Sequence, residues 1–108
     1  MTVHRGVVTS FSSLSYRGHA VYLRDASAAH LIAAIEAAAL ARAWNTFRDL
    51  IQRSRRRCGR IRFDRAMFGL ANVAPWMIEK TQFPRTGSIV DLHLDENMQL
   101  TRLQIVER

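Results

Sequence analysis

The sequence predicts a single small α+β domain over residues 1–108, in which an antiparallel sheet packs on one long alanine-rich helix. Apolar and polar residues alternate near both ends of the chain, and apolar residues at helical spacing fill the middle. The length of 108 residues, with 48% hydrophobic and 23% charged residues, fits one globular domain with one core.

Residues 3–24 predict an N-terminal hairpin. Val7, Thr9 and Phe11 recur at every second position, which places them on one face of a strand. Residues 17–18 provide a turn, and the residues after them favour a second strand.

A long helix is predicted from about residue 26 to Arg57. Asp25 or Ser27 can cap its start, because either side chain accepts hydrogen bonds from the first free N–H groups. Gly59 stands where a left-handed C-cap would end the helix. Alanine, the best helix former, dominates the first half, and the apolar face is formed by Ile32, Ile35, Ala39, Ala43, Phe47, Leu50 and Ile51.

The predicted helix is longer than a small domain is wide. At 1.5 Å per residue it would reach roughly 45 Å, which exceeds the width of a small domain. The helix therefore either breaks, near Asn45 and Thr46, or projects past its own core. The small side chains of a projecting alanine-rich helix let the backbone of another chain approach closely, so we expect a homodimer or part of a larger complex. In the alternative, the alanines pack only on the chain's own sheet.

Residues 60–65 predict a short strand, although they would also serve to open another helix. Ile61 and Phe63 point one way and Arg60 and Arg62 the other, which gives the strand a basic outer face.

The next segment is strongly apolar, and Pro75 predicts a short helix over residues 75–81. A loop over residues 82–88 leads to a C-terminal hairpin with strands at 88–94 and 99–107. Pairing Leu94 with Gln99 places Asp91 opposite Arg102, so that opposite charges meet across the two strands.

The charge of the chain is concentrated in one segment. Sixteen basic residues against nine acidic ones give a net charge of +7 and a sequence pI near 11.2. Arginines packed closely repel one another, and a polyanion or an acidic partner relieves that repulsion. Residues 48–65 carry eight arginines against two aspartates, and these are the candidate binding residues: Arg48, Arg53, Arg55, Arg56, Arg57, Arg60, Arg62 and Arg65.

Nucleic acid, either DNA or RNA, is the partner class that this segment favours. A guanidinium contacts phosphate through two hydrogen bonds and also stacks on bases. Phe63 and Phe68 would either offer a stacking platform for unpaired bases or belong to the core. On a helix, one side would carry the arginines at spacings of three or four: Arg53, Arg56, Arg57 and Arg60.

Two alternatives to nucleic acid remain open for the arginines. The first is an adaptor or inhibitor that docks the basic surface on an acidic protein, with Phe68, Trp76 and Met77 as an apolar interface rather than core. The second is a solvated helix end, where cations favour the C-terminal dipole. That effect accounts for one or two arginines and not for eight.

Catalysis has less support, and we expect no enzyme. No P-loop, metalloprotease or nucleophile-elbow motif is present, and the four histidines share no metal-ligand spacing, so no metal or cofactor is expected. Cys58 is alone, and we expect it to be inert. A small basic ribonuclease is the third hypothesis, because His19 and His93 lie on predicted strands and would act as acid and base if they met beside an arginine.

The cellular setting follows from composition. No apolar run approaches the ~20 residues that a membrane span needs, and a single cysteine forms no disulfide within the chain. We therefore expect a cytoplasmic, reduced and complete protein that does not contact a membrane.

Overall fold

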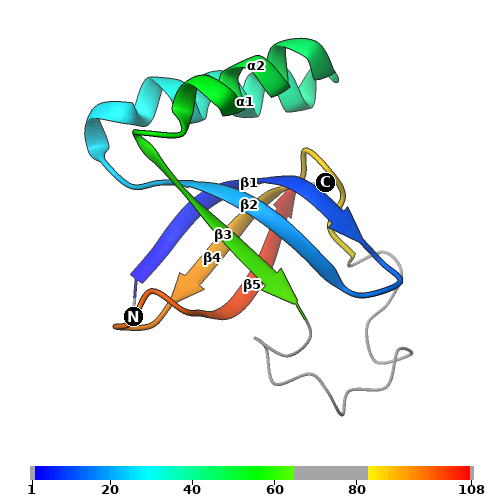
Figure 1. The fold of residues 1–108 in the computed structure, drawn as a ribbon, viewed down its shortest axis with the longest axis vertical. Coiled ribbons are helices and arrows are strands. Elements are labelled where there is room, and N and C mark those ends of the chain that lie inside the picture. Colours follow the sequence, from blue (N-terminus) through cyan, green and yellow to red (C-terminus); the bar gives the residue numbers. More distant parts are fainter. Residues whose placement is uncertain (1, 65–82, 108) are drawn as a thin grey trace.

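Five strands and two helices form the residues that this computed structural model describes, 2–64 and 83–107 (Figure 1). The strands are β1 (Thr2–Ser12), β2 (Arg17–Leu23), β3 (Cys58–Asp64), β4 (Ile89–Leu94) and β5 (Leu100–Glu107). A short 3₁₀ helix (Ala26–Ala28) leads into α1 (Ala29–Leu40), which is followed by α2 (Trp44–Ser54). An antiparallel sheet with its helices on one side confirms the predicted α+β class.

Several predictions concern residues beyond those described. The short helix over residues 75–81, the candidate interface of Phe68, Trp76 and Met77, and the eighth arginine, Arg65, all lie outside the described residues.

β1 is the central strand of the sheet. The strand order is β3-β2-β1-β4-β5, and every neighbouring pair is antiparallel. The predicted hairpins β1–β2 and β4–β5 are both present, and β1 joins them by pairing Thr2 with Leu94 and Val7 with Ile89. β3 follows the helices in the chain and adds to the free side of β2.

The sheet curls until side chains from its two outermost strands share one core. Phe63 of β3, Leu92 of β4 and Leu100 of β5 are buried in the same apolar cluster, although β3 and β5 are not neighbours in the strand order. In Figure 1, β4 and β5 run across the direction of β3. Among the described residues, this inner core is therefore formed by strand residues alone and comes from the twist of the strands.

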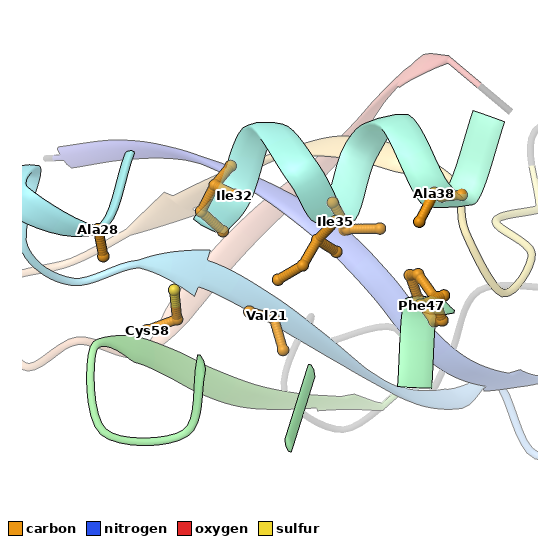
Figure 2. Close-up of a cluster of buried hydrophobic side chains, with 9 residues drawn as sticks. Val21, Ala28, Ile32, Ile35, Ala38, Phe47 and Cys58 are labelled. Carbon is orange, nitrogen blue, oxygen red and sulfur yellow. The ribbon is translucent and has the colours of Figure 1, made fainter. Parts of the chain in front are cut away.

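The two helices cover the outer face of the curl and form a second core with it (Figure 2). Ile35 of α1 and Phe47 of α2 are buried against Val7 and Val21 of the sheet. Adjacent residues of β1 serve the two cores, because Val7 packs under the helices and Val8 inside the curl.

The helical pattern forms two helices instead of one long helix, because the chain breaks at residues 41–43. Of the two predicted alternatives the break is the one found, and it lies just before Asn45. The two helices have 12 and 11 residues. Arg42 adopts a left-handed backbone conformation with a φ of 55°, and the N–H of Ala43 donates to the carbonyl of Ala38 at 2.9 Å. These features define a Schellman cap, in which glycine usually occupies the position of Arg42. An arginine there costs roughly 1 kcal/mol of backbone strain.

The break changes what the helices do. α2 lies alongside α1, so that Phe47 reaches the core beneath both helices. A helix that folds back in this way does not project past its own core. The reason to expect a second copy of the chain is thereby removed, and the oligomeric state stays a prediction.

The N-terminal hairpin has a different phase and turn from those predicted. The register of β1 against β2 shifts between Val8 and Ser10, which marks a β-bulge and reverses the alternation after it. As a result Val7 faces the helices whereas Phe11 packs against the inner core, so the predicted shared face is wrong. The turn lies at residues 13–16, and the predicted turn residues 17–18 belong to β2.

The register of the C-terminal hairpin also differs from the predicted one. Leu94 pairs with Leu100, and a register irregularity beside it places Asp91 opposite Gln104 instead of Arg102. The carboxylate of Asp91 instead accepts a hydrogen bond from Nε of Arg5 on β1, at 3.0 Å. The predicted ion pair across the hairpin is therefore replaced by one across β1 and β4.

Of the two residues predicted to cap the helical region, Asp25 is a cap and Gly59 is not. Asp25 caps the 3₁₀ helix through a hydrogen bond from the N–H of Ser27 (3.0 Å), as predicted. Gly59 is no C-cap, because it lies within β3 opposite Tyr22. A Cβ atom at Gly59 would lie 2.2 Å from the Tyr22 ring, so the glycine makes room for that side chain.

Candidate functional site

The arginines of residues 48–62 lie on three successive elements. α2 ends at Ser54, so the prediction that Arg53, Arg56, Arg57 and Arg60 line one side of a single helix is wrong. Arg53 belongs to the last turn of α2, Arg56 lies in the turn that follows, and Arg60 lies in β3. The turn is short, and it therefore keeps these elements close together.

The strand part of the site follows the predicted alternation. Ile61 and Phe63 face the inner core, whereas Arg60 and Arg62 are exposed on the outer face. Arg60 lies beside the end of α2, where it lines a cavity with Ser54 and Arg55. Phe63 has no exposed surface, and it therefore belongs to the core and offers no platform for bases.

One side of α2 continues this basic face. Trp44, Arg48, Ile51 and Arg55 follow one another at spacings of four, three and four residues, which align them along a single side of the helix. Trp44 keeps 37% of its surface exposed, and its ring meets that of Phe47 edge-on at 5.5 Å. An exposed aromatic ring therefore stands at one end of the stripe and arginines at the other.

We call the following set the arginine surface: Arg24, Arg48, Arg55, Arg56, Arg57, Arg60 and Arg62. Arg53 is left out, because Asp49 pairs with it at 3.0 Å. Within the surface, Arg62 lies 3.6 Å from the carboxylate of Asp64. The pKa of Asp25 is lowered mainly by the hydrogen bonds from Ser27, and the nearby charge of Arg57 lowers it further. The other five have no ion pair among the described residues.

Three of these five arginines line one cavity of about 180 Å³, which we call the arginine pocket. Arg24 follows β2, Arg55 ends α2 and Arg60 lies in β3, so each comes from a different element. The rest of the wall is uncharged and consists of Val21, Ile51, Ser54 and Cys58. The pocket is therefore a concave, cationic site within the arginine surface.

Cys58 also lines the arginine pocket and stays uncharged there. Burial raises the pKa of its thiol, and the hydrogen bond with Ser54 and the charges of Arg24 and Arg57 offset that rise only in part. Ser54 is itself buried and donates its hydroxyl to the carbonyl of Ile51 at 2.9 Å. Since the thiolate is the nucleophilic form of cysteine, this environment disfavours covalent chemistry at Cys58.

His19 borders the arginine surface on β2. It pairs across the sheet with Arg62, and its Nδ1 lies 3.3 Å from the hydroxyl of Ser10 on β1. Burial lowers the pKa of His19 below its ordinary value of 6.5, and the charges of Arg60 and Arg62 lower it further. The imidazole is therefore neutral at physiological pH.

This lowered pKa predicts a pH dependence of stability. In the pH range below about 6.5 the unfolded chain protonates His19 more readily than the folded chain, so the free energy of unfolding should fall as the pH falls. Urea unfolding of wild type and His19→Gln at pH 7.5 and 5.5 measures the effect, with the exposed His30→Gln as the matched control. His19→Gln should lose part of the pH dependence and His30→Gln should keep it. An unchanged dependence in His19→Gln would contradict the expectation.

His19 and His93, which the ribonuclease hypothesis requires to meet, lie apart in the sheet. β1 separates their strands, and His19 faces Ser10 whereas His93 faces Val3. Seven residues along β1 correspond to roughly 23 Å. The structure therefore supplies no histidine pair for the ribonuclease hypothesis.

Sequence reasoning missed one member of the site, Arg24. Leu23 pairs with Cys58, which brings the residue after β2 beside the turn that precedes β3. Only the pairing of β2 with β3 reveals this neighbourhood, since the two segments lie far apart in the chain. A register prediction for these strands would have found it.

Two larger hollows lie at the α1–α2 turn, and the shallower of them, about 560 Å³, is lined by Trp44, Asn45 and Arg48. A cavity of about 430 Å³ lies between the α1–α2 turn and residues 85–87, where Trp44, Arg42 and Arg85 meet Glu107. Within residues 2–64 and 83–107, no three side chains of metal-ligating type are grouped together.

Comparisons with known proteins assign no family. No protein-family model matches the sequence, and no curated protein and no solved structure resembles the chain significantly. Neither described helix is both long enough and apolar enough to cross a bilayer.

Proposed function

We propose that this chain is a small non-enzymatic protein that binds nucleic acid through the arginine surface. The observation that carries the proposal is the set of exposed arginines that have no ion pair among the described residues and lie on adjoining elements. Arg48 and Arg55 share one side of α2, Arg55 and Arg60 share the arginine pocket, and Arg56 lies between them in the turn.

The chemistry of phosphate suits this arrangement better than the dipole of α2 does. A helix C-terminus favours cations only within its last turn, whereas Arg48 lies in the turn before it and Arg60 lies on a strand. Guanidinium groups bind phosphate through paired hydrogen bonds, and nucleic acid offers phosphates in a row. Trp44 at the far end of the α2 stripe adds a ring on which an unpaired base can stack.

An oligonucleotide titration at low salt tests the proposal directly. Wild type should bind a short mixed-sequence strand labelled for fluorescence anisotropy, and Arg48→Gln/Arg56→Gln should bind it about tenfold or more weakly. Arg102→Gln, an exposed arginine on β5, removes one charge elsewhere and should weaken binding much less.

Two results would count against nucleic acid. Equal losses per arginine for Arg102→Gln and for the double variant would mean that net charge alone drives binding. Absence of binding by folded wild type would overturn the proposal and favour the alternative partner, an acidic protein surface.

A further inference from the structure

The arginine pocket places more positive charge at one point than a passing strand requires. A phosphodiester within a strand carries one negative charge, whereas the side chains of Arg24, Arg55 and Arg60 all line this cavity. A terminal phosphate monoester carries about −1.5 to −2 at neutral pH, because its second pKa is near 6, and it has three free oxygens that accept hydrogen bonds. The charge at the pocket therefore matches a strand end better than a strand interior.

The size of the pocket supports the same ligand group. Its volume of about 180 Å³ is below the ~300–1,000 Å³ of sites that enclose drug-sized molecules, and it equals about six waters at ~30 Å³ each. A phosphate group fits such a space.

No carboxylate is among the residues that line the pocket. The carboxylate nearest in sequence, Asp25, lies outside this lining, where it accepts hydrogen bonds from the N–H and hydroxyl of Ser27. The remaining wall is neutral, since Val21 and Ile51 are apolar and the thiol of Cys58 stays protonated. These neighbours favour binding of an anion without reaction.

We propose that the arginine pocket binds the terminal phosphate monoester of a nucleic-acid strand, whose backbone continues over the rest of the arginine surface. This inference rests on the proposed function. The strand end supplies an anchor of fixed position, and Arg48 and Arg56 hold the phosphates that follow. The same chemistry exists at a 5′ and at a 3′ end, and the two are separated by the test.

The test compares three oligonucleotides of one sequence that carry a 5′-phosphate, a 3′-phosphate or hydroxyl groups at both ends. At fixed salt, one phosphorylated strand should bind wild type about tenfold or more tightly than the hydroxyl strand. Hydrogen bonds to one additional charged group strengthen binding by about this factor. Arg24→Gln should abolish this gain in affinity. Arg24→Lys should keep only part of it, because lysine retains the positive charge but lacks the paired N–H donors of the guanidinium. Arg48→Gln, outside the pocket, should weaken all three strands alike and preserve the gain.

Each contrary outcome has a distinct meaning. Equal binding of the three strands by wild type overturns the phosphate-end inference and leaves the proposed function standing. A gain that survives Arg24→Gln, in protein whose circular dichroism shows it folded, also overturns the inference, because the end then lies elsewhere. Absence of binding by all three overturns both.

Discussion

Raising the salt concentration from about 50 to about 200 mM should weaken oligonucleotide binding by about sixtyfold to a thousandfold. Each phosphate contact releases counterions and adds roughly 0.7 to the log–log slope for a single strand and roughly 0.9 for a duplex, so four to six contacts give a slope of about −3 to −5. Arg48, Arg55, Arg56 and Arg60 can contact phosphates without breaking an ion pair among the described residues, and Arg62 can do so at the cost of its contact with Asp64.

The slope can also be dissected by residue. Arg48→Gln/Arg56→Gln should lower it by about 1.4 to 1.8 units. Arg53→Gln should change it little, since Asp49 already pairs with Arg53 and is freed by the substitution. Fluorescence anisotropy at several salt concentrations gives the slope for each variant. A wild-type slope near zero would show that phosphates are not contacted.

Phe63→Ala should destabilise the fold by about 3–5 kcal/mol, the largest single effect that we expect on stability. Phe63 is fully buried, and its ring stacks with that of Phe11 at a centroid distance of 6.0 Å. It also fills the space above Gly18, where a Cβ atom would come within 2.6 Å of the ring. Removing the ring leaves a cavity at the junction of β1, β2 and β3.

Urea unfolding measures this loss, and Val106→Ala provides the control, since Val106 is 46% exposed on β5. Its loss should be well below 1 kcal/mol. Any Phe63→Ala protein that remains folded should bind oligonucleotides as wild type does. A loss below about 1 kcal/mol, or a specific loss of binding, would contradict the assignment of Phe63 to the core.

The strands were predictable from sequence to the extent that their signals are local. Alternation reveals the strands of both hairpins and the outward arginines of β3, whereas the turn of the N-terminal hairpin lies at residues 13–16 and not at the predicted 17–18. The predicted strand registers were wrong because β-bulges shift the alternation of side chains between the two faces, as between Val8 and Ser10. No residue type in the sequence marks the position of such a bulge. The length of the helical pattern predicts a break but does not fix its position, because Arg42 takes a glycine conformation within a run of alanines that contains no helix breaker.

The candidate site was predictable only along the chain and not across it. The run of arginines is visible in the sequence, and its concentration of charge is real in three dimensions. The value of each arginine depends on neighbours that only the fold brings together. Asp49 removes Arg53 from the set, whereas the pairing of β2 with β3 adds Arg24.

The central position of β1 has a consequence for the kinetics of folding. Arg5 and Asp91 meet across β1 and β4 although they are 86 residues apart in sequence, whereas each hairpin closes within a few residues. The hairpins should therefore form within ~1–10 μs, and joining them should be much slower, because a long loop must close first. Until then the apolar lining of the curl is open to solvent in both halves. In that interval the positive charge of the chain keeps partly folded molecules apart, which favours completion of the sheet over self-association.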